Sequence, residues 1–170
     1  RSEKELGEKT KEKISLFCDV EEEEVISNPD LENIYRIPLK FLKQDLDRTV
    51  QEKLGLEEKE TDMANWREII ENMEKEAETK IAICGKYTDM DDTYASIEQA
   101  LKHAAAHKGS AIETEYFNTE EMEPERLDKV DGVIIPGGFG SRGIKGKREV
   151  ARYCRKNNKP LLGLCLGMQI

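Results

Sequence analysis

The sequence predicts an α/β fold in which a parallel sheet is covered by helices, and the C-terminal half carries the pattern. Short apolar segments occur at Ile81–Cys84, Ala111–Phe117, Val133–Ile135 and Leu161–Leu164. Segments with helical periodicity separate the first pair and the last pair, and Gly or Pro residues follow several of the apolar segments. Strands that alternate with helices are typical of a parallel sheet with helices on its faces.

The residues before this region predict less regular structure. An apolar core at Lys13–Val20 predicts a strand, and the acidic run Glu21–Glu24 predicts a solvated turn or a helix start after it. Apolar residues at every fourth position over residues 46–54, followed by Gly55, predict a short helix. A second amphipathic helix is expected at Trp66–Met73.

Two further helices are expected to cover the sheet. The first has an apolar face over residues 94–104 and ends before Gly109, and Asp91, Asp92 and Thr93 can cap its N-terminus. The second directs Val150, Ala151 and Cys154 inward and ends at Asn157 and Asn158.

The composition restricts the classes of function. The 170 residues are 37% apolar and 37% charged, and the net charge of −9 argues against sequence-independent binding to nucleic acid. The four cysteines form no C-x-x-C pair and only two histidines accompany them, so no metal site is predicted. No apolar run predicts a membrane span or a secretory leader, which favours a cytoplasmic protein with free thiols.

The motif Gly163-Leu164-Cys165-Leu166-Gly167 directly follows the last predicted strand. This spacing is typical of a nucleophile on a sharp strand-to-helix turn, where glycines on either side remove colliding side chains. The turn brings the backbone N–H of Leu166 beside the sulfur, where it can stabilise an oxyanion, and the start of a helix favours the thiolate. The alternative is that Cys165 is a small buried residue at a strand end.

A glycine-rich segment, Pro136–Gly143, follows the preceding strand. Because the carboxyl ends of neighbouring parallel strands meet in one crevice, this loop and the Cys165 turn are expected to line the same pocket. An ordinary turn is the alternative, but the segment holds more glycines than a reversal of direction requires.

Several segments together resemble one enzyme family. PGGFGSRGIKGK, ARYCRKNNKP and LLGLCLGMQ are similar to the class I glutamine amidotransferase domain of CTP synthases, and IAICGKYTDMDDTYASIEQALKHA is similar to the opening of that domain. KEKISLFCDVEEEEVISNPDLENIYRIPLKF resembles the last part of the synthetase domain.

The resemblance implies a division of the chain into three parts. Residues 1–55 would be the end of a P-loop-type synthetase domain, residues 56–79 a linker with a helix, and residues 80–170 the first part of an amidotransferase domain. The family implies an amidoligase that phosphorylates UTP with ATP and Mg²⁺ and aminates it with ammonia from glutamine. It also implies inhibition by CTP, activation by GTP and a homotetramer, with the Mg²⁺ ligands outside this chain.

The resemblance also assigns roles to individual residues. Cys165 matches the nucleophile, Gly137 and Leu166 match the oxyanion hole, and Lys13 matches a UTP- and CTP-binding position. Asp30 and Leu31 match positions beside ATP. The glutamine-contacting positions are Gly138, Leu166, Gly167, Met168 and Gln169.

The catalytic base is not expected within this chain. His103 and His107 lie on a predicted helix before the nucleophile, whereas in the family the base and its orienting glutamate follow the cysteine. The chain alone is therefore expected to be inactive. Two alternatives remain at this point: another cysteine hydrolase with an elbow nucleophile, or a non-catalytic interaction module of amidotransferase shape.

Overall fold

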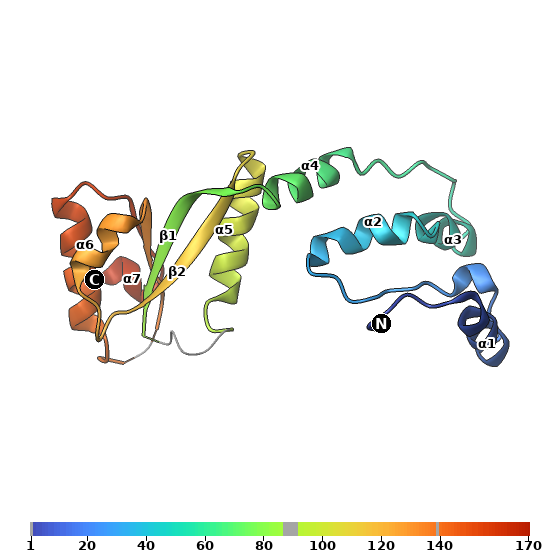
Figure 1. Cartoon of the computed structure of the whole chain (residues 1–170), viewed down its shortest axis with the longest axis horizontal. Helices are drawn as coiled ribbons and strands as arrows, with labels where there is room; N and C mark the ends of the chain where they lie inside the picture. The colour runs from blue at the N-terminus through green and yellow to red at the C-terminus, as the bar shows by residue number, and fades with distance from the viewer. Residues whose placement is uncertain (1, 87–91, 139) are drawn as a thin grey trace. The chain divides into compact units, whose positions relative to one another are not determined.

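The computed structural model describes residues 2–86, 92–138 and 140–170, and the chain divides into two compact units (Figure 1). The first unit spans Arg1–Ile70 and the second Glu71–Ile170. The division falls within the segment 56–79 that the sequence suggests as a linker.

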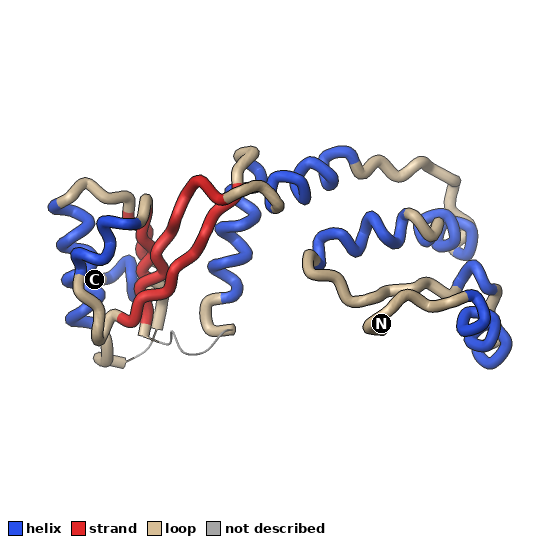
Figure 2. The backbone as a smooth tube through the Cα atoms, in the orientation of Figure 1, coloured by secondary structure: helices blue, strands red, loops and turns tan. Residues whose placement is uncertain are grey.

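The first unit is built from helices joined by irregular chain (Figure 2). Its α-helices are α1 (Glu8–Cys18), α2 (Ile37–Leu42), α3 (Leu46–Lys53) and the greater part of α4 (Ala64–Met73). Two 3-10 turns, η1 (Glu22–Glu24) and η2 (Ile34–Arg36), lie between α1 and α2. The predictions of α3 with its glycine stop, of α4, and of a turn at the acidic run are confirmed. The helix α2 was not predicted.

The predicted strand at Lys13–Val20 is wrong, because residues 13–18 continue the helix α1, which ends at Cys18. A short apolar run has no periodicity that distinguishes a strand from a helix. Here the run follows the Glu- and Lys-rich segment 8–13, whose residues are strong helix formers, and the helix extends through it to Cys18. Leu16 and Phe17 remain 79% and 83% exposed, so burial did not select the conformation.

The second unit contains a four-stranded sheet with the order β2-β1-β3-β4 and parallel pairing throughout. The strands are β1 (Ala77–Gly85), β2 (Ala111–Asn118), β3 (Gly132–Ile135) and β4 (Leu161–Gly163). The predicted parallel sheet with flanking helices is therefore confirmed. The largest difference is at the start of β1, which lies four residues before the predicted Ile81, whereas the bounds of the other strands differ by one residue at one end.

Helices cover both faces of this sheet. Figure 1 shows α5 (Ala95–His107) and α6 (Ile144–Lys156) on opposite sides of it. Inward residues of α6, Val150 and Cys154, pack in a core with Ala82 and Cys84 of β1 and with residues of β2, β3 and the 3-10 helix η3 (Pro124–Lys129). The predicted inward face of α6 is confirmed.

The N-terminus of α5 differs in detail from the prediction. Its N-cap residue is Tyr94, and no side chain caps it, so Asp92 and Thr93 do not fill the predicted role. Asp91 lies outside the described residues. The Tyr94 hydroxyl instead accepts a hydrogen bond from the backbone N–H of Lys86 at 3.2 Å, which ties the start of α5 to the end of β1.

Candidate active site at the ends of strands β3 and β4

The candidate site is built on the two neighbouring strands β3 and β4. Ile135, the last residue of β3, is in register with Gly163, the last residue of β4. The backbone N–H of Leu164 donates to the carbonyl of Ile135 at 2.9 Å. The glycine-rich loop and the Cys165 turn therefore leave the sheet side by side, as the sequence predicts.

Cys165 has a strained backbone. Its φ of 53° and ψ of −111° are unusual for a residue with a side chain, and such conformations cost about 1–3 kcal/mol. The residue lies between β4 and the short helix α7 (Leu166–Gln169), and it is exposed. Cys165 is thus not a buried residue that ends a strand, and its thiol is accessible to a small molecule.

Each of the two glycines of the motif, Gly163 and Gly167, is required by a different close contact. A Cβ atom on Gly163 would lie 2.4 Å from the carbonyl oxygen of Gly167, and one on Gly167 would lie 2.0 Å from the carbonyl oxygen of Ile135. Both distances are well below van der Waals contact. The elbow can therefore close only with glycine at both positions, which confirms the interpretation of the spacing.

The glycine-rich loop approaches Cys165 at Gly137. A Cβ on Gly137 would lie 3.3 Å from Cβ and 3.7 Å from Sγ of Cys165. Gly138 follows with a φ of 154°, in the region that glycine favours. The structure therefore brings together Gly137 and Gly138 with Cys165 and, on α7, the predicted residues Leu166, Gly167, Met168 and Gln169.

Two lysines that the sequence analysis did not single out lie beneath this loop. Lys86 follows β1 and Lys147 lies on α6, and they are 7% and 1% exposed. The Nζ of Lys147 donates to the carbonyl of Pro136 at 2.9 Å and lies 3.4 Å from that of Gly137. Burial lowers the pKa of Lys147, and the charge of Lys86 lowers it further, while Cys165 acts in the opposite direction.

The sequence did hold a signal for Lys147. It stands three residues before Val150 and seven before Cys154, on the stripe of α6 that was expected to face the core. A lysine on such a stripe must find polar partners, because an unpaired buried charge is costly.

Further contacts fix the far end of the loop. Arg142 donates from Nε to Glu120 at 2.7 Å, which joins the loop to the turn after β2. A Cβ on Gly146 would lie 1.6 Å from the carbonyl oxygen of Thr119, so the first turn of α6 packs directly on that backbone. The loop is therefore held at both ends.

Comparisons with known proteins agree on one family. The family description "Glutamine amidotransferase class-I" matches residues 89–170, and "CTP synthase N-terminus" matches residues 1–56. The CTP synthase of Clostridium perfringens (strain SM101) is 46% identical over 99% of this chain, and that of Desulfitobacterium hafniense is 42% identical over 99%. The CTP synthase of Haloquadratum walsbyi is 45% identical over 95%.

The chain belongs to the CTP synthase family. It spans 32% of the Clostridium relative, 33% of the Desulfitobacterium relative and 30% of the Haloquadratum relative, about a third of their length. A solved structure, the glutaminase domain of Trypanosoma brucei CTPS with bound acivicin, matches with a TM-score of 0.50 and 37% identity. The match covers 54% of this chain and 38% of that one.

The two histidines of the chain, His103 and His107, lie on α5 and are exposed. The helix α5 starts after β1 and ends just before β2, so it runs back from the carboxyl edge of the sheet to its amino edge. His107 therefore lies near the edge opposite Cys165, and His103 one turn before it. Neither histidine is therefore placed to act as the base for Cys165.

The residues expected at the nucleotide sites of the family lie in the first unit. Lys13 is exposed on α1. Asp30 and Leu31 belong to the segment between η1 and η2, where the N–H of Asp30 donates to the carbonyl of Ser2 at 3.0 Å. The three residues are thus on two separate segments, and their assigned roles stay predictions.

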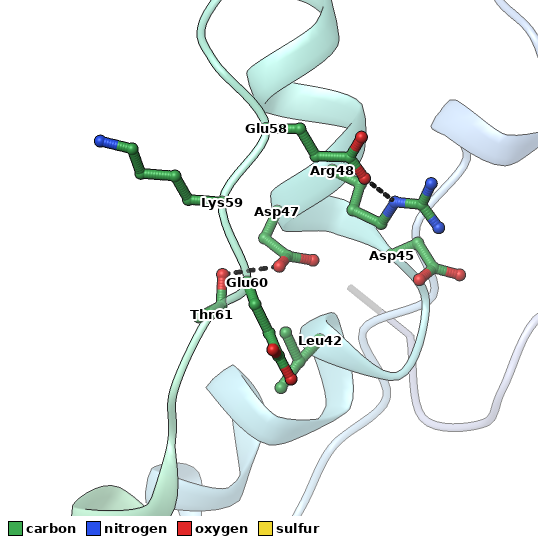
Figure 3. A pocket seen from close by; sticks show the side chains of 8 residues that line it. All are labelled: Leu42, Asp45, Asp47, Arg48, Glu58, Lys59, Glu60 and Thr61. Atoms are coloured by element: carbon green, nitrogen blue, oxygen red, sulfur yellow. Dashed lines mark hydrogen bonds and ion pairs between the residues drawn. The ribbon is translucent and has the colours of Figure 1, made fainter.

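A hollow of about 620 Å³ in the first unit does not suit a nucleotide (Figure 3). Arg48 pairs with Glu58 at 2.9 Å, and the hydroxyl of Thr61 donates to Asp47 at 2.6 Å. Acidic side chains outnumber basic ones around it, which repels a polyphosphate. The lining residues, none of which was predicted as a site residue, are Leu42, Asp45, Asp47, Arg48, Glu58, Lys59, Glu60 and Thr61.

Among residues 2–86, 92–138 and 140–170, no group of three or more His, Cys, Asp or Glu side chains is placed to hold a metal ion. No helix in the same residues is both long and apolar enough to cross a membrane.

Proposed function

We propose that this chain is a segment of a glutamine-hydrolysing CTP synthase and that Cys165 is the nucleophile that opens the glutamine carboxamide. The observation that carries the proposal is the strained, exposed elbow at Cys165, packed against Gly137 of the glycine-rich loop. The family membership supports the identity of the substrate.

The chemistry follows from the groups around the sulfur. The thiolate adds to the carboxamide carbon, and the carbonyl oxygen becomes an oxyanion that the N–H groups of Gly137 and Leu166 are proposed to stabilise. The C–N bond then breaks, ammonia leaves with an added proton, and water hydrolyses the thioester to glutamate. Gly138 and the residues Leu166, Gly167, Met168 and Gln169 are proposed to hold the rest of the glutamine molecule.

The proton transfers need a group that the described site does not supply. A positioned acid and base contributes about 10²–10⁴-fold to such reactions. In the family, a histidine and a glutamate after the cysteine fill this role. We propose that the chain depends on such residues and that it is inactive without them.

The first unit is proposed to belong to the synthetase part of the enzyme. There Lys13 would contact UTP or CTP, and Asp30 and Leu31 would lie beside ATP. Mg²⁺ would bind residues other than those described. Inhibition by CTP, activation by GTP, a homotetramer and a cytoplasmic location complete the proposal, all by analogy with the family.

The proposal can be tested by labelling the chain with acivicin, a glutamine-like amino acid that carries an electrophilic carbon. We expect mass spectrometry to find the adduct on Cys165 and L-glutamine to slow its formation. The Cys165→Ala variant is the blank, and exposed Cys18 is the internal control. Equal labelling of Cys18 and Cys165, without protection by glutamine, would count against the proposal.

A further inference from the structure

The inference concerns Lys147 and the peptide between Pro136 and Gly137. Lys147 reaches from the buried face of α6 to the first turn of the glycine-rich loop, where its ammonium donates to the Pro136 carbonyl at 2.9 Å. The Gly137 carbonyl lies 3.4 Å from the same nitrogen. One buried cation therefore binds two successive carbonyl groups of the loop beside Cys165.

An apolar side chain at position 147 would be buried at a lower free-energy cost than a lysine. Burying an ammonium removes its hydration, and Lys86 adds a second positive charge nearby. The neighbours of Lys147 on the inward stripe, Val150 and Cys154, fill the core without any charge. The hydrogen bonds of the Lys147 ammonium to the loop therefore offset the free-energy cost of burying its charge.

The geometry of a peptide shows what those contacts do. The C=O and N–H of a trans peptide point in opposite directions, so the group that holds the carbonyl also fixes the direction of the N–H. No cis peptide bond occurs in the described chain. With the Pro136 oxygen held by Lys147, the N–H of Gly137 faces away from α6. An ammonium on the oxygen also polarises the amide and makes its N–H a better donor.

We propose that Lys147 is a positioning residue that holds the Pro136–Gly137 peptide so that the Gly137 N–H serves as an oxyanion donor beside Cys165. The role of the Gly137 N–H as an oxyanion donor rests on the proposed function, whereas the hydrogen bond between Lys147 and the Pro136 carbonyl does not. A Cβ on Gly138 would be in ordinary van der Waals contact with both lysines, 3.8 Å from Nζ of Lys147 and 3.7 Å from Cε of Lys86, so both side chains lie directly beside the loop.

The hydrogen bond between Lys147 and the Pro136 carbonyl can be measured in the unmodified chain by nuclear magnetic resonance. A hydrogen bond between Nζ of Lys147 and the Pro136 carbonyl transmits a scalar coupling between that nitrogen and the carbonyl carbon. We expect the coupling to be detectable at low temperature. A Lys147 ammonium that exchanges freely with water and shows no coupling to Pro136 would overturn the proposal.

A pair of variants separates this role from a general effect of charge. Lys147→Met keeps the length of the buried side chain, and Lys145→Met removes a charge two residues earlier from a side chain that is 93% exposed. We expect the Pro136 carbonyl carbon and the Gly137 amide to change chemical shift in Lys147→Met only. Equal shifts in both variants would contradict the inference.

The effect of Lys147→Met on the oxyanion donor can be measured by comparing how fast two reagents label Cys165. Iodoacetamide reacts at a saturated carbon and needs no oxyanion donor, whereas acivicin reacts at a C=N carbon and develops negative charge on nitrogen. We expect Lys147→Met to lower the ratio of acivicin to iodoacetamide labelling of Cys165 by about tenfold or more. An unchanged ratio would overturn the proposal.

If even the unmodified chain resists acivicin, the proposed function fails. The scalar coupling between Nζ of Lys147 and the Pro136 carbonyl carbon then still decides whether Lys147 holds the loop.

Discussion

Cys165 and Cys18 are both exposed, but their backbone surroundings differ. Cys18 is the last residue of α1, at the end of the helix where the backbone carbonyl groups are free, and the acidic turn η1 contacts the same helix. Cys165 precedes the first N–H groups of α7 and lies beside Lys147. The alkylation rates of the two exposed thiols can therefore be compared within one molecule.

We predict that Cys165 is alkylated faster than the other three cysteines. Burial raises the pKa of Cys84 to about 12, and burial also raises the pKa of Cys154, so both stay protonated and covered. Limiting iodoacetamide followed by peptide mass spectrometry would give the order. Faster labelling of Cys84 or Cys154 than of Cys165 would contradict this prediction.

We predict that Gly167→Ala destabilises the second unit by about 1–3 kcal/mol, because overpacked sites cost about that much. The new Cβ would lie 2.0 Å from the Ile135 carbonyl oxygen. Met168→Ala on the same short helix is the control, since Met168 is 70% exposed and its loss should change stability by less than about 0.5 kcal/mol. Denaturant titrations of both variants would test this, and equal stability would mean that the elbow adjusts freely.

At the scale of the elements, the alternation of strands and helices could be predicted because buried parallel strands are short apolar runs. The same reasoning placed the start of β1 too late. Its first residues are exposed, and Lys80 pairs across the sheet with Glu113 at 3.1 Å, so ion pairs rather than apolar contacts support that end. The helix α1 was missed because its apolar run carries no buried face that periodicity could reveal.

The candidate site could be predicted only in part for a related reason. The glycines and Cys165 are visible in the sequence since their spacing encodes a turn. Lys147 on α6 fixes the loop by a hydrogen bond to the Pro136 carbonyl, which follows β3. Residue spacing within one element does not reveal such a contact between two elements. A charged residue on an apolar stripe was the available signal.

The contact between α5 and β2 predicts a dependence on pH. Glu98 on α5 accepts hydrogen bonds from Lys102 at 2.7 Å and from the hydroxyl of Tyr116 on β2 at 3.0 Å. The hydrogen bond with Lys102, with help from Tyr116, lowers the pKa of Glu98. A carboxylate with a lowered pKa stabilises the fold above the pKa of the unfolded chain and loses that contribution as the pH falls through its folded value.

We therefore predict that Glu98→Gln lowers the free energy of unfolding at pH 7 by less than about 1 kcal/mol and that the difference vanishes in acid. Stability measured between pH 7 and pH 3 would test it. The control is Glu149→Gln on α6, which removes a helical carboxylate that lies 4.0 Å from Nζ of Lys145. A deficit of Glu98→Gln that persists unchanged at low pH would contradict the assignment.

At the scale of the whole molecule, the two units differ in how much they bury. None of the residues of α1, α2 and α3 is buried, whereas every residue of β3 is. Few buried contacts allow local opening at low free energy. We predict that amide hydrogens of α1, α2 and α3 exchange faster than those of β1 and β3. Exchange of α1 as slow as that of Ile134 would show that the first unit has more stability than its burial provides.

We propose that Cys165 releases ammonia from glutamine for the amination of UTP. The most direct test is CTP formation by a full-length CTP synthase whose matching segment is replaced by this chain. We predict that the enzyme with Cys165 forms CTP from either glutamine or free ammonia and that the Cys165→Ala variant forms CTP from ammonia alone. CTP formation from glutamine that persists at the same rate in Cys165→Ala would contradict it.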